Sequence, residues 1–154
     1  MGIEIERKFL VTNDEWRKGS TSTYYRQAYL ATGPPASVRL RIAGNTAMLN
    51  IKESTLDISR AEFDYPIPLE EAEHMLNHLC DGQSIEKNRY LIQHQGLQWE
   101  VDEFLGDNQG LIIAELELET EDQAFDSPPW LGQEVSQDPR YFNTYLSQNP
   151  YSTW

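Results

Sequence analysis

Residues 3–11 read IEIERKFLV, a run in which charged and apolar side chains alternate. Glu4, Glu6 and Lys8 occupy even-numbered positions, whereas the odd-numbered positions carry Ile, Phe and Val, with Arg7 as the exception. Because successive side chains of a β-strand point to opposite faces of a sheet, this period of two predicts a strand. One face of that strand is apolar and the other is purely charged.

Further runs along the chain share this period of two. We expect strands at 3–11, 23–31, 37–43, 46–53, 58–67, 84–93, 98–105 and 111–120. The turns between them suit antiparallel hairpins and are Gly33-Pro34-Pro35, Gly44-Asn45, Gln95-Gly96 and Gly106-Asp107-Asn108. At Gly44-Asn45 we expect both residues to have a positive φ, as a two-residue hairpin loop requires. Sequential hairpins indicate a meandering antiparallel sheet.

One amphipathic helix interrupts the predicted strands. The segment LEEAEHMLNHLC at 69–80 follows Pro68 and repeats its apolar residues at helical spacing, so we expect one of its faces to pack on the sheet. Shorter helices are expected at 13–18 and 138–147. Because we find no repeat or linker, we expect residues 1–154 to form a single domain, mainly β (α+β), with a few flanking helices.

The basic residues are concentrated on the charged faces of the predicted strands. These faces carry eight of the 12 Lys and Arg residues, namely Lys8, Arg26, Arg39, Arg41, Lys52, Arg60, Lys87 and Arg89. The same faces carry the carboxylates Glu4, Glu6, Glu62, Asp64, Glu100, Asp102, Glu115, Glu117 and Glu119. An acidic protein would not collect most of its cations in this way by chance.

A charged strand face usually points to solvent, where cross-strand ion pairs contribute about 0.2–1 kcal/mol each. A solvated face would also contain Ser, Thr, Asn and Gln freely, and these faces largely lack them. Eight strands can close into a barrel whose interior holds one ligand, and buried charges there need a neutralising partner. We therefore interpret the charged faces as a lumen, with cations that bind a polyanion and carboxylates that bind a hard divalent metal. The apolar faces then point outward and lie under the helices.

Composition limits the classes of partner and compartment. The chain has 25 Asp and Glu against 12 Lys and Arg, a formal net charge of -13, which disfavours binding to nucleic acid or to an anionic membrane. A single cysteine excludes an internal disulfide, and the N-terminus lacks the apolar core of a signal peptide. No apolar run is long enough for a membrane helix. We expect a folded protein of the cytoplasm, either a monomer or a homodimer.

Residues Glu4-Ile5-Glu6-Arg7-Lys8 resemble the N-terminal Glu-x-Glu-x-Lys signature of the CYTH superfamily, also called triphosphate tunnel metalloenzymes. Further elements resembling the family pattern follow in order over nearly the whole chain: Arg39-x-Arg41, Lys52, Lys87-x-Arg89, Glu100-x-Asp102, Glu115-x-Glu117, Trp130-x-Gly-x-Glu134 and Asp138-x-Arg140-Tyr141. The resemblance implies a closed eight-stranded antiparallel β-barrel (tunnel), a linear triphosphate substrate and dependence on Mg²⁺ or Mn²⁺.

The resemblance also implies roles for individual residues. The metal-binding carboxylates would be Glu4, Glu6, Glu100, Asp102, Glu115 and Glu117. The substrate-binding cations would be Lys8, Arg26, Arg39, Arg41, Lys52, Arg60, Lys87 and Arg89. Tyr29 resembles an active-site tyrosine of short bacterial members, but the alternation places it opposite Arg26, so one of these two assignments is wrong or the strand carries a bulge.

Phosphoryl transfer depends mainly on positioning and charge stabilisation, which suits such a set of cations. We expect a metal-associated water to attack a terminal phosphorus in line, with Lys8 or a surplus carboxylate, Glu62 or Glu119, assisting proton transfer. The expected catalytic residues are therefore Lys8, Tyr29 and Glu62. His74 and His78 have a spacing that can bind zinc, but we interpret them as surface residues because the Glu of a zinc-protease motif is absent between them.

Three functions are compatible with these residues. The first is a metal-dependent inorganic triphosphatase that hydrolyses tripolyphosphate to pyrophosphate and phosphate, because the chain is short and has no obvious base-binding insertion. The alternative is a class IV-like adenylate cyclase, or a thiamine or nucleoside triphosphatase. The third is a non-catalytic polyphosphate-binding module, which would need the cations but not two separate carboxylate pairs.

Overall fold

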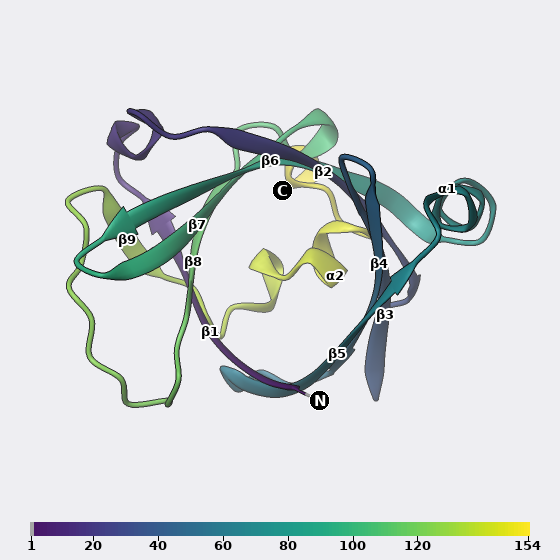
Figure 1. The fold of residues 1–154 in the computed structure, drawn as a ribbon, viewed down its shortest axis with the longest axis horizontal. Helices are drawn as coiled ribbons and strands as arrows, with labels where there is room; N and C mark the ends of the chain where they lie inside the picture. Colours follow the sequence, from purple (N-terminus) through teal and green to yellow (C-terminus); the bar gives the residue numbers. More distant parts are fainter. Residues whose placement is uncertain (1) are drawn as a thin grey trace.

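Eight antiparallel strands close into a barrel in the computed structural model, which describes residues 2–154 (Figure 1). The hydrogen-bonded order is β5-β4-β3-β2-β6-β7-β8-β1, and β1 also pairs with β5 to complete the ring. The strands are β1 (Gly2–Val11), β2 (Ser22–Ala31), β3 (Ala36–Ala43), β4 (Thr46–Glu53), β5 (Ser59–Ile67), β6 (Asp81–His94), β7 (Leu97–Phe104) and β8 (Ile112–Glu117). The predicted closed eight-stranded barrel is confirmed.

A ninth strand, β9 (Leu131–Glu134), pairs with the outer part of β1 and was not predicted. It is only four residues long and reads LGQE, so it offers no alternation from which a strand can be inferred. The Arg7 side chain fixes β9 to β1, because its Nη2 lies 2.6 Å from Glu134 Oε1. This ion pair explains why Arg7 breaks the apolar pattern of the first strand.

The hairpin loops differ from expectation in one detail. At the β3–β4 turn only Gly44 has a positive φ, of 60°, and Asn45 does not share it. Both residues have a positive φ at the β6–β7 turn instead, where Gln95 has 50° and Gly96 has 78°. A two-residue loop with φ positive at both positions is therefore found at Gln95-Gly96.

The apolar strand faces point outward and are covered in two places. The helix α1 (Leu69–His78) lies against β2 and β3, where Leu76 packs on Ala28 and Leu40. The outer face of β1, β7 and β8 is covered by Trp16, from the 3₁₀ turn η1 (Glu15–Arg17), and by Trp130, which precedes β9. The inverted arrangement predicted from the sequence, with apolar faces outside, is confirmed for these walls.

The C-terminal segment enters the ring and fills one end of it, as the yellow ribbon in Figure 1 shows. It contains η3 (Pro139–Tyr141), α2 (Asn143–Leu146) and η4 (Tyr151–Thr153), so the expected helix at 138–147 is broken at the extended residue Phe142. Leu146 is fully buried in an apolar cluster with Tyr29, Ile85 and Phe104, which lie on inward-facing positions. The lumen is therefore closed by apolar residues at this end.

The remaining short element is η2 (Gly106–Asn108), between β7 and β8. Among residues 2–154 there is no helix with the length and apolar character needed to cross a membrane.

Candidate functional site

The charged strand faces meet inside the barrel and line a cavity of about 200 Å³. Six lysines and arginines line it: Lys8, Arg39, Arg41, Lys52, Lys87 and Arg89. Seven carboxylates line it as well: Glu4, Glu6, Glu62, Asp64, Glu100, Glu115 and Glu117. The predicted lumen is thus present, and it contains most of the residues that the alternation pattern places on the charged faces.

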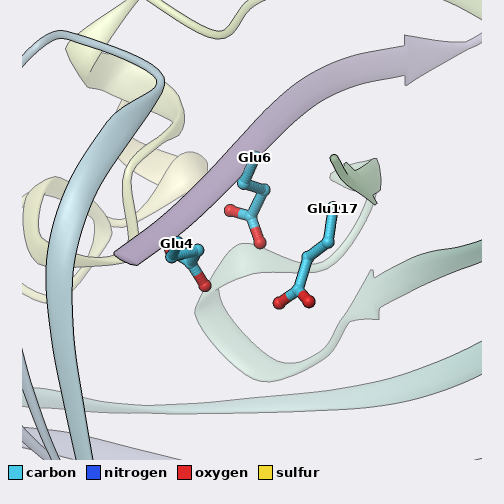
Figure 2. Close-up of side chains that lie close together, drawn as sticks. All are labelled: Glu4, Glu6 and Glu117. Atoms are coloured by element: carbon cyan, nitrogen blue, oxygen red, sulfur yellow. The ribbon is translucent and has the colours of Figure 1, made fainter. Parts of the chain in front are cut away.

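Three carboxylates form a compact cluster at one wall of the cavity. Glu4 and Glu6 extend from β1, and Glu117 extends from the paired strand β8 at the position opposite Glu6. One oxygen from each carboxylate lies within 4.8 Å of the others, and Figure 2 shows the three side chains converging. We refer to Glu4, Glu6 and Glu117 below as the carboxylate trio.

The chemistry of the trio fits a hard divalent cation, because carboxylate oxygens are the ligands that Mg²⁺ and Mn²⁺ prefer. Burial, together with the negative charges of Glu4, Glu100 and Glu6, raises the pKa of Glu117 to about 7. The raised pKa reflects burial first and repulsion between like charges second, and a bound cation would favour the ionised form against both. Glu115 and Glu100, two further expected metal ligands, line the cavity outside the trio.

Two lysines connect the trio to the other carboxylates. Lys8 Nζ lies 3.1 Å from Glu6 Oε1 and 3.4 Å from Glu115 Oε1. Lys52 Nζ lies 3.0 Å from Glu4 Oε1 and 3.3 Å from Glu62 Oε2. Lys52 therefore bridges β1 and β5. Burial acts to raise the pKa of Glu6, but the positive charges of Lys8 and Lys52 outweigh burial, and the pKa falls to about 2. Burial acts to lower the pKa of Lys8, but Glu115 and Glu6 raise it above its ordinary value, so Lys8 is protonated within the cavity.

Asp102 does not belong to the trio. It is fully buried and accepts hydrogen bonds from Lys87 Nζ at 2.7 Å and from Arg89 Nε and Nη2 at 2.8 Å each. Burial opposes its ionisation, but Arg89 and Lys87 lower the pKa of Asp102 to about 2. Both oxygens of Asp102 are engaged by Lys87 and Arg89, and its expected metal-binding role stays a prediction. Its place in the fold is that of a support for Lys87 and Arg89.

Lys87 responds in the opposite sense. Burial lowers its pKa to about 7, and the repulsion of Arg89 and Arg41 adds to burial, although Asp102 acts to raise it. Transferring an ammonium group from water to the protein interior costs free energy. The carboxylate of Asp102, which Lys87 shares with Arg89, offsets only part of that cost. The charge on Lys87 therefore depends on Asp102 and on any anion that enters the cavity.

Arg39 and Arg41 differ from the other cavity cations, since neither forms an ion pair within residues 2–154. The Nε atoms of both are buried without a hydrogen-bond partner. Burial and the repulsion of Arg39 and Arg89 lower the pKa of Arg41 to about 10, which still leaves it protonated at neutral pH. Two unpaired guanidinium groups in a polar cavity form a ready binding site for an oxyanion.

The ring of Tyr25 contacts the guanidinium groups of Arg41 and Arg89. Its ring centroid is 5.0 Å from Cζ of Arg41 and 5.0 Å from Cζ of Arg89, within the range of cation–π attraction. The alternation of β2 would have identified Tyr25 as an inward residue had the strand been read from Tyr29. The charge of Arg26 led instead to the prediction that the even-numbered residues of this strand face the lumen.

The structure corrects the assignment of Arg26 to the lumen. Its Nη2 donates to Asn77 Oδ1 of α1 at 2.7 Å, so the side chain lies outside the barrel. Inward positions on β2 are Tyr25, Gln27 and Tyr29, and Gln27 donates to Asn143 Oδ1 at 2.9 Å within the ring. The strand also carries a register shift between Gln27 and Tyr29. Tyr29 is therefore inward, as its resemblance to a family residue implied.

The remaining candidates occupy distinct places. Glu62 lines the cavity, whereas Glu119 follows the end of β8, is exposed and lies outside the cavity lining. Arg60 lies behind the cavity, beside Phe142. His74 and His78 are exposed on α1, as expected of surface residues.

Sequence reasoning missed two polar residues of the site besides Tyr25, namely Asn50 and Asn143. Asn50 donates to Asp64 Oδ1 at 2.5 Å and to Glu62 Oε2 at 3.2 Å, and so orders the carboxylates of β5. Asn50 lies on an inward position of β4, so the alternation rule that placed Asp64 on the charged face could have found it too. Asn143 comes from the C-terminal segment, and no sequence signal predicts that this segment enters the ring.

Comparisons with known proteins agree with this geometry. The CYTH domain family matches residues 2–142. The chain is 46% identical over 154 residues to an inorganic triphosphatase of Acetivibrio thermocellus, covering 100% of this chain and 99% of the relative. It is 38% identical over 150 residues to an inorganic triphosphatase of Nitrosomonas europaea, covering 94% and 96%.

A solved structure shows the same fold. The crystal structure of an inorganic triphosphatase superimposes with a TM-score of 0.67 at 34% sequence identity, over 93% of this chain and 96% of that chain. The match to the CYTH domain family, over residues 2–142, includes the trio, the cavity cations and the first residues of the C-terminal segment. The barrel, its charged lumen and these relatives together show that the chain belongs to the CYTH domain family.

Proposed function

We propose that this protein is an inorganic triphosphatase that hydrolyses tripolyphosphate to pyrophosphate and orthophosphate. The observation that carries the proposal is the pair of unpaired guanidinium groups, Arg39 and Arg41, in the same cavity as the carboxylate trio. The guanidinium pair suits an anion and the carboxylate trio suits a cation. A linear triphosphate and a divalent metal supply both together. The inorganic triphosphatases to which the chain is similar support this choice.

The charge balance of the cavity supports a requirement for metal. Its lining holds six cations and seven carboxylates, so the side chains alone give no excess of positive charge when all are ionised. Tripolyphosphate carries roughly four to five negative charges near neutral pH, and such an ion is not attracted by a neutral or acidic lumen. We propose that Glu4, Glu6 and Glu117 hold Mg²⁺ or Mn²⁺, which would supply Lewis-acid polarisation of phosphate oxygens.

The residues of the chain then position the substrate. Arg39 and Arg41 bind phosphate oxygens through paired N–H groups, while Lys8 and Lys52 neutralise oxygens nearest the trio. Lys87 and Arg89, oriented by Asp102, complete the grip from β6. These contacts align the phosphate chain for in-line attack and stabilise negative charge that shifts to the leaving oxygen.

The hydrolysis itself joins the oxygen of one water to a terminal phosphorus. The bond from that phosphorus to the bridging oxygen breaks, pyrophosphate leaves with the bond electrons, and the water releases a proton. Glu62 is the proposed acceptor of this proton, because it lines the cavity and Lys52 and Asn50 hold it in place. Lys8 and Tyr29, the other expected catalytic residues, border the trio and the rear of the lumen respectively.

The acidic surface and the single free cysteine support a place in the cytoplasm and no nucleic-acid or membrane partner. We propose that residues 1–154 act as one functional unit, as a monomer or a homodimer.

The test compares tripolyphosphate, ATP and thiamine triphosphate as substrates, with Mg²⁺, with Mn²⁺ and with a chelator. Orthophosphate and cyclic AMP are measured separately. We expect orthophosphate from tripolyphosphate with either metal, no turnover with chelator, and loss of turnover when Glu4→Gln and Glu6→Gln are combined. Cyclic AMP as the main product would instead indicate an adenylate cyclase. Metal-dependent binding without turnover of any substrate would indicate a binding module.

A further inference from the structure

Behind Lys8 and Arg39 the interior of the barrel continues into a smaller chamber of about 50 Å³. The chamber shares part of its wall with the main cavity: Glu4, Glu6, Lys8, Arg39, Lys52 and Asn143. Its rear wall consists of Tyr29, Ser37, Arg60, Phe142 and Thr144. Since each water needs about 10–15 Å³ by this measure, the chamber has room for a few waters, or for one small ion that displaces them.

A surface groove of about 360 Å³ adjoins the chamber from outside. Ser37, Arg60, Phe142 and Thr144 line both the groove and the chamber, so these side chains form the partition between the lumen and solvent. The outer side of the groove is formed by the chain between β2 and β3 and by the chain between β4 and β5. The apolar closure of the barrel by Leu146 therefore leaves one polar passage beside it.

Arg60 is the only charged side chain of this partition. Its Nη2 donates to the carbonyl oxygens of Thr55 and Asp57, at 3.2 Å each, and its Cζ lies 5.6 Å from the ring centroid of Phe142. Within residues 2–154 Arg60 forms no ion pair, in contrast to Lys8 and Lys52 deeper in the lumen. Two long bonds to neutral carbonyls are weaker than bonds to an anion, so Arg60 can exchange them for phosphate oxygens.

Two carboxylates of the trio lie where the main cavity meets the rear chamber. Glu4 and Glu6 border both the main cavity and the rear chamber, whereas Glu62, Glu100 and Glu117 border the main cavity alone. A phosphoryl group cleaved beside Glu4 and Glu6 becomes orthophosphate at the entrance of the chamber. Pyrophosphate, held by the cations of the main cavity, then lies between this orthophosphate and the mouth, by which we mean the end of the barrel opposite the C-terminal segment.

We propose that the rear chamber binds the orthophosphate product and releases it to the groove through the partition at Arg60, while pyrophosphate leaves by the mouth. This inference rests on the proposed triphosphatase function. The guanidinium of Arg60 and the hydroxyl groups of Ser37 and Thr144 supply a charge and hydrogen-bond donors, which suit a tetrahedral oxyanion.

The experiment uses the full-length protein with saturating Mn²⁺ and three variants. Arg60→Gln removes the charge of the partition, and Thr144→Trp fills the passage. Arg26→Gln is the matched control, because Arg26 lies outside the barrel against α1. Orthophosphate and pyrophosphate are each tested as inhibitors, and orthophosphate formation by rapid quench is compared with its release to a fluorescent phosphate sensor.

For Arg60→Gln we expect the inhibition constant of orthophosphate to rise roughly tenfold, as for loss of one charge-assisted hydrogen bond, while that of pyrophosphate stays unchanged. For Thr144→Trp we expect release to lag behind formation, with a burst in the quench experiment. Arg26→Gln should match the wild-type protein in every measurement.

Equal changes in both inhibition constants would place Arg60 in the main substrate site and overturn the proposal. Release that keeps pace with formation in both variants would overturn it as well. If Thr144→Trp does not fold, as judged by circular dichroism, the two inhibition constants of Arg60→Gln decide alone. A wild-type protein without tripolyphosphate hydrolysis would refute the proposed function instead, and this result differs from each of the others.

Discussion

The ring of Tyr25 contacts two cavity cations, Arg41 and Arg89. Arg41 and Arg89 each lie 5.0 Å from its centroid, and Arg89 acts to lower the pKa of Arg41 by repulsion. The ring attracts both guanidinium groups and fixes their orientation toward the cavity. Tyr25 is thus a positioning residue.

Substitutions of Tyr25 separate the ring from the hydroxyl group. We expect Tyr25→Leu to raise the KM for tripolyphosphate by roughly five- to tenfold, because about 1 kcal/mol of cation–π attraction is lost. Tyr25→Phe keeps the ring and should restore a KM near that of the wild-type protein. A Phe variant as impaired as the Leu variant would show that the hydroxyl group matters instead. Steady-state kinetics at saturating Mn²⁺ measure both.

Asp102→Asn tests the support of Lys87 and Arg89. The substitution keeps the shape of the side chain but leaves two buried cations without their shared counter-charge, so we expect the free energy of unfolding to fall by about 3 kcal/mol. The folded-state pKa of Asp102, about 2, lies below the ordinary 3.8, so its stabilising effect is present above that range and disappears as the pH falls toward 2. Urea denaturation of both proteins at several pH values measures the difference. A difference that persists at pH 2 would contradict the assignment.

Glu117 makes metal binding depend on pH. Its pKa of about 7 means that much of the metal-free protein holds a proton on this carboxyl at neutral pH, and a bound cation must displace it. We therefore expect the affinity for Mn²⁺ to rise as the pH increases from 6 to 8, with proton release detected by calorimetry in buffers of different ionisation enthalpy. Glu117→Gln should bind Mn²⁺ more weakly and without this dependence. An unchanged pH dependence in that variant would assign the proton to another group.

At the scale of single elements, the C-terminal segment decides which end of the lumen is open. Leu146 is fully buried against Tyr29, Ile85 and Phe104, and the neighbouring Asn143 is fixed by Gln27. The segment is held by these contacts rather than by helix propensity, because α2 has only four residues.

Leu146→Ala should therefore destabilise the protein by about 2–4 kcal/mol, through lost burial and the cavity left behind. Leu79→Ala is the matched control: Leu79 directly follows α1, has 57% of its surface exposed, and its substitution should change stability little. Guanidinium denaturation measures both, and hydrogen exchange at residues 143–147 should accelerate only in Leu146→Ala. Equal stability of the two variants would show that the segment is not anchored by this side chain.

The sequence predicted elements best where one physical rule acted alone. Alternation on β1, β7 and β8 predicted both the strands and their inward charges, such as Glu6 and Glu117. On β2 two signals conflicted, because Arg26 is charged yet packs beside α1, and charge was the weaker guide to orientation. The strand β9 and the path of the C-terminal segment depend on tertiary contacts, such as the Arg7–Glu134 pair, which no local pattern records.

At the scale of the whole molecule, the net charge of -13 and the cavity cations belong to different surfaces. Asp102 illustrates why the site could be predicted in composition but not in role. Alternation placed it correctly inside, but only the distances show that both of its oxygens are paired with Lys87 and Arg89.

Ring closure gives the whole molecule a kinetic prediction. The trio spans β1 and β8, whose partners Glu6 and Glu117 are about 110 residues apart in the chain, so forming it requires a large loop to close. If β1 docks late, Mn²⁺ should slow unfolding several-fold and leave the refolding rate nearly unchanged. Stopped-flow folding with and without Mn²⁺ measures both rates. Faster refolding with Mn²⁺ would show that β1 and β8 are already paired in the transition state.

The double pairing of β1 also has a consequence during synthesis on the ribosome. β1 is translated before the other strands, yet its two neighbours within the barrel are β5 and β8, and the latter ends at Glu117. Until that strand has emerged, the nascent chain exposes unpaired strand edges, which can pair with other chains. The most vulnerable period in the life of this protein is therefore the interval before its last barrel strand leaves the ribosome, and chaperones that shield strand edges would act then.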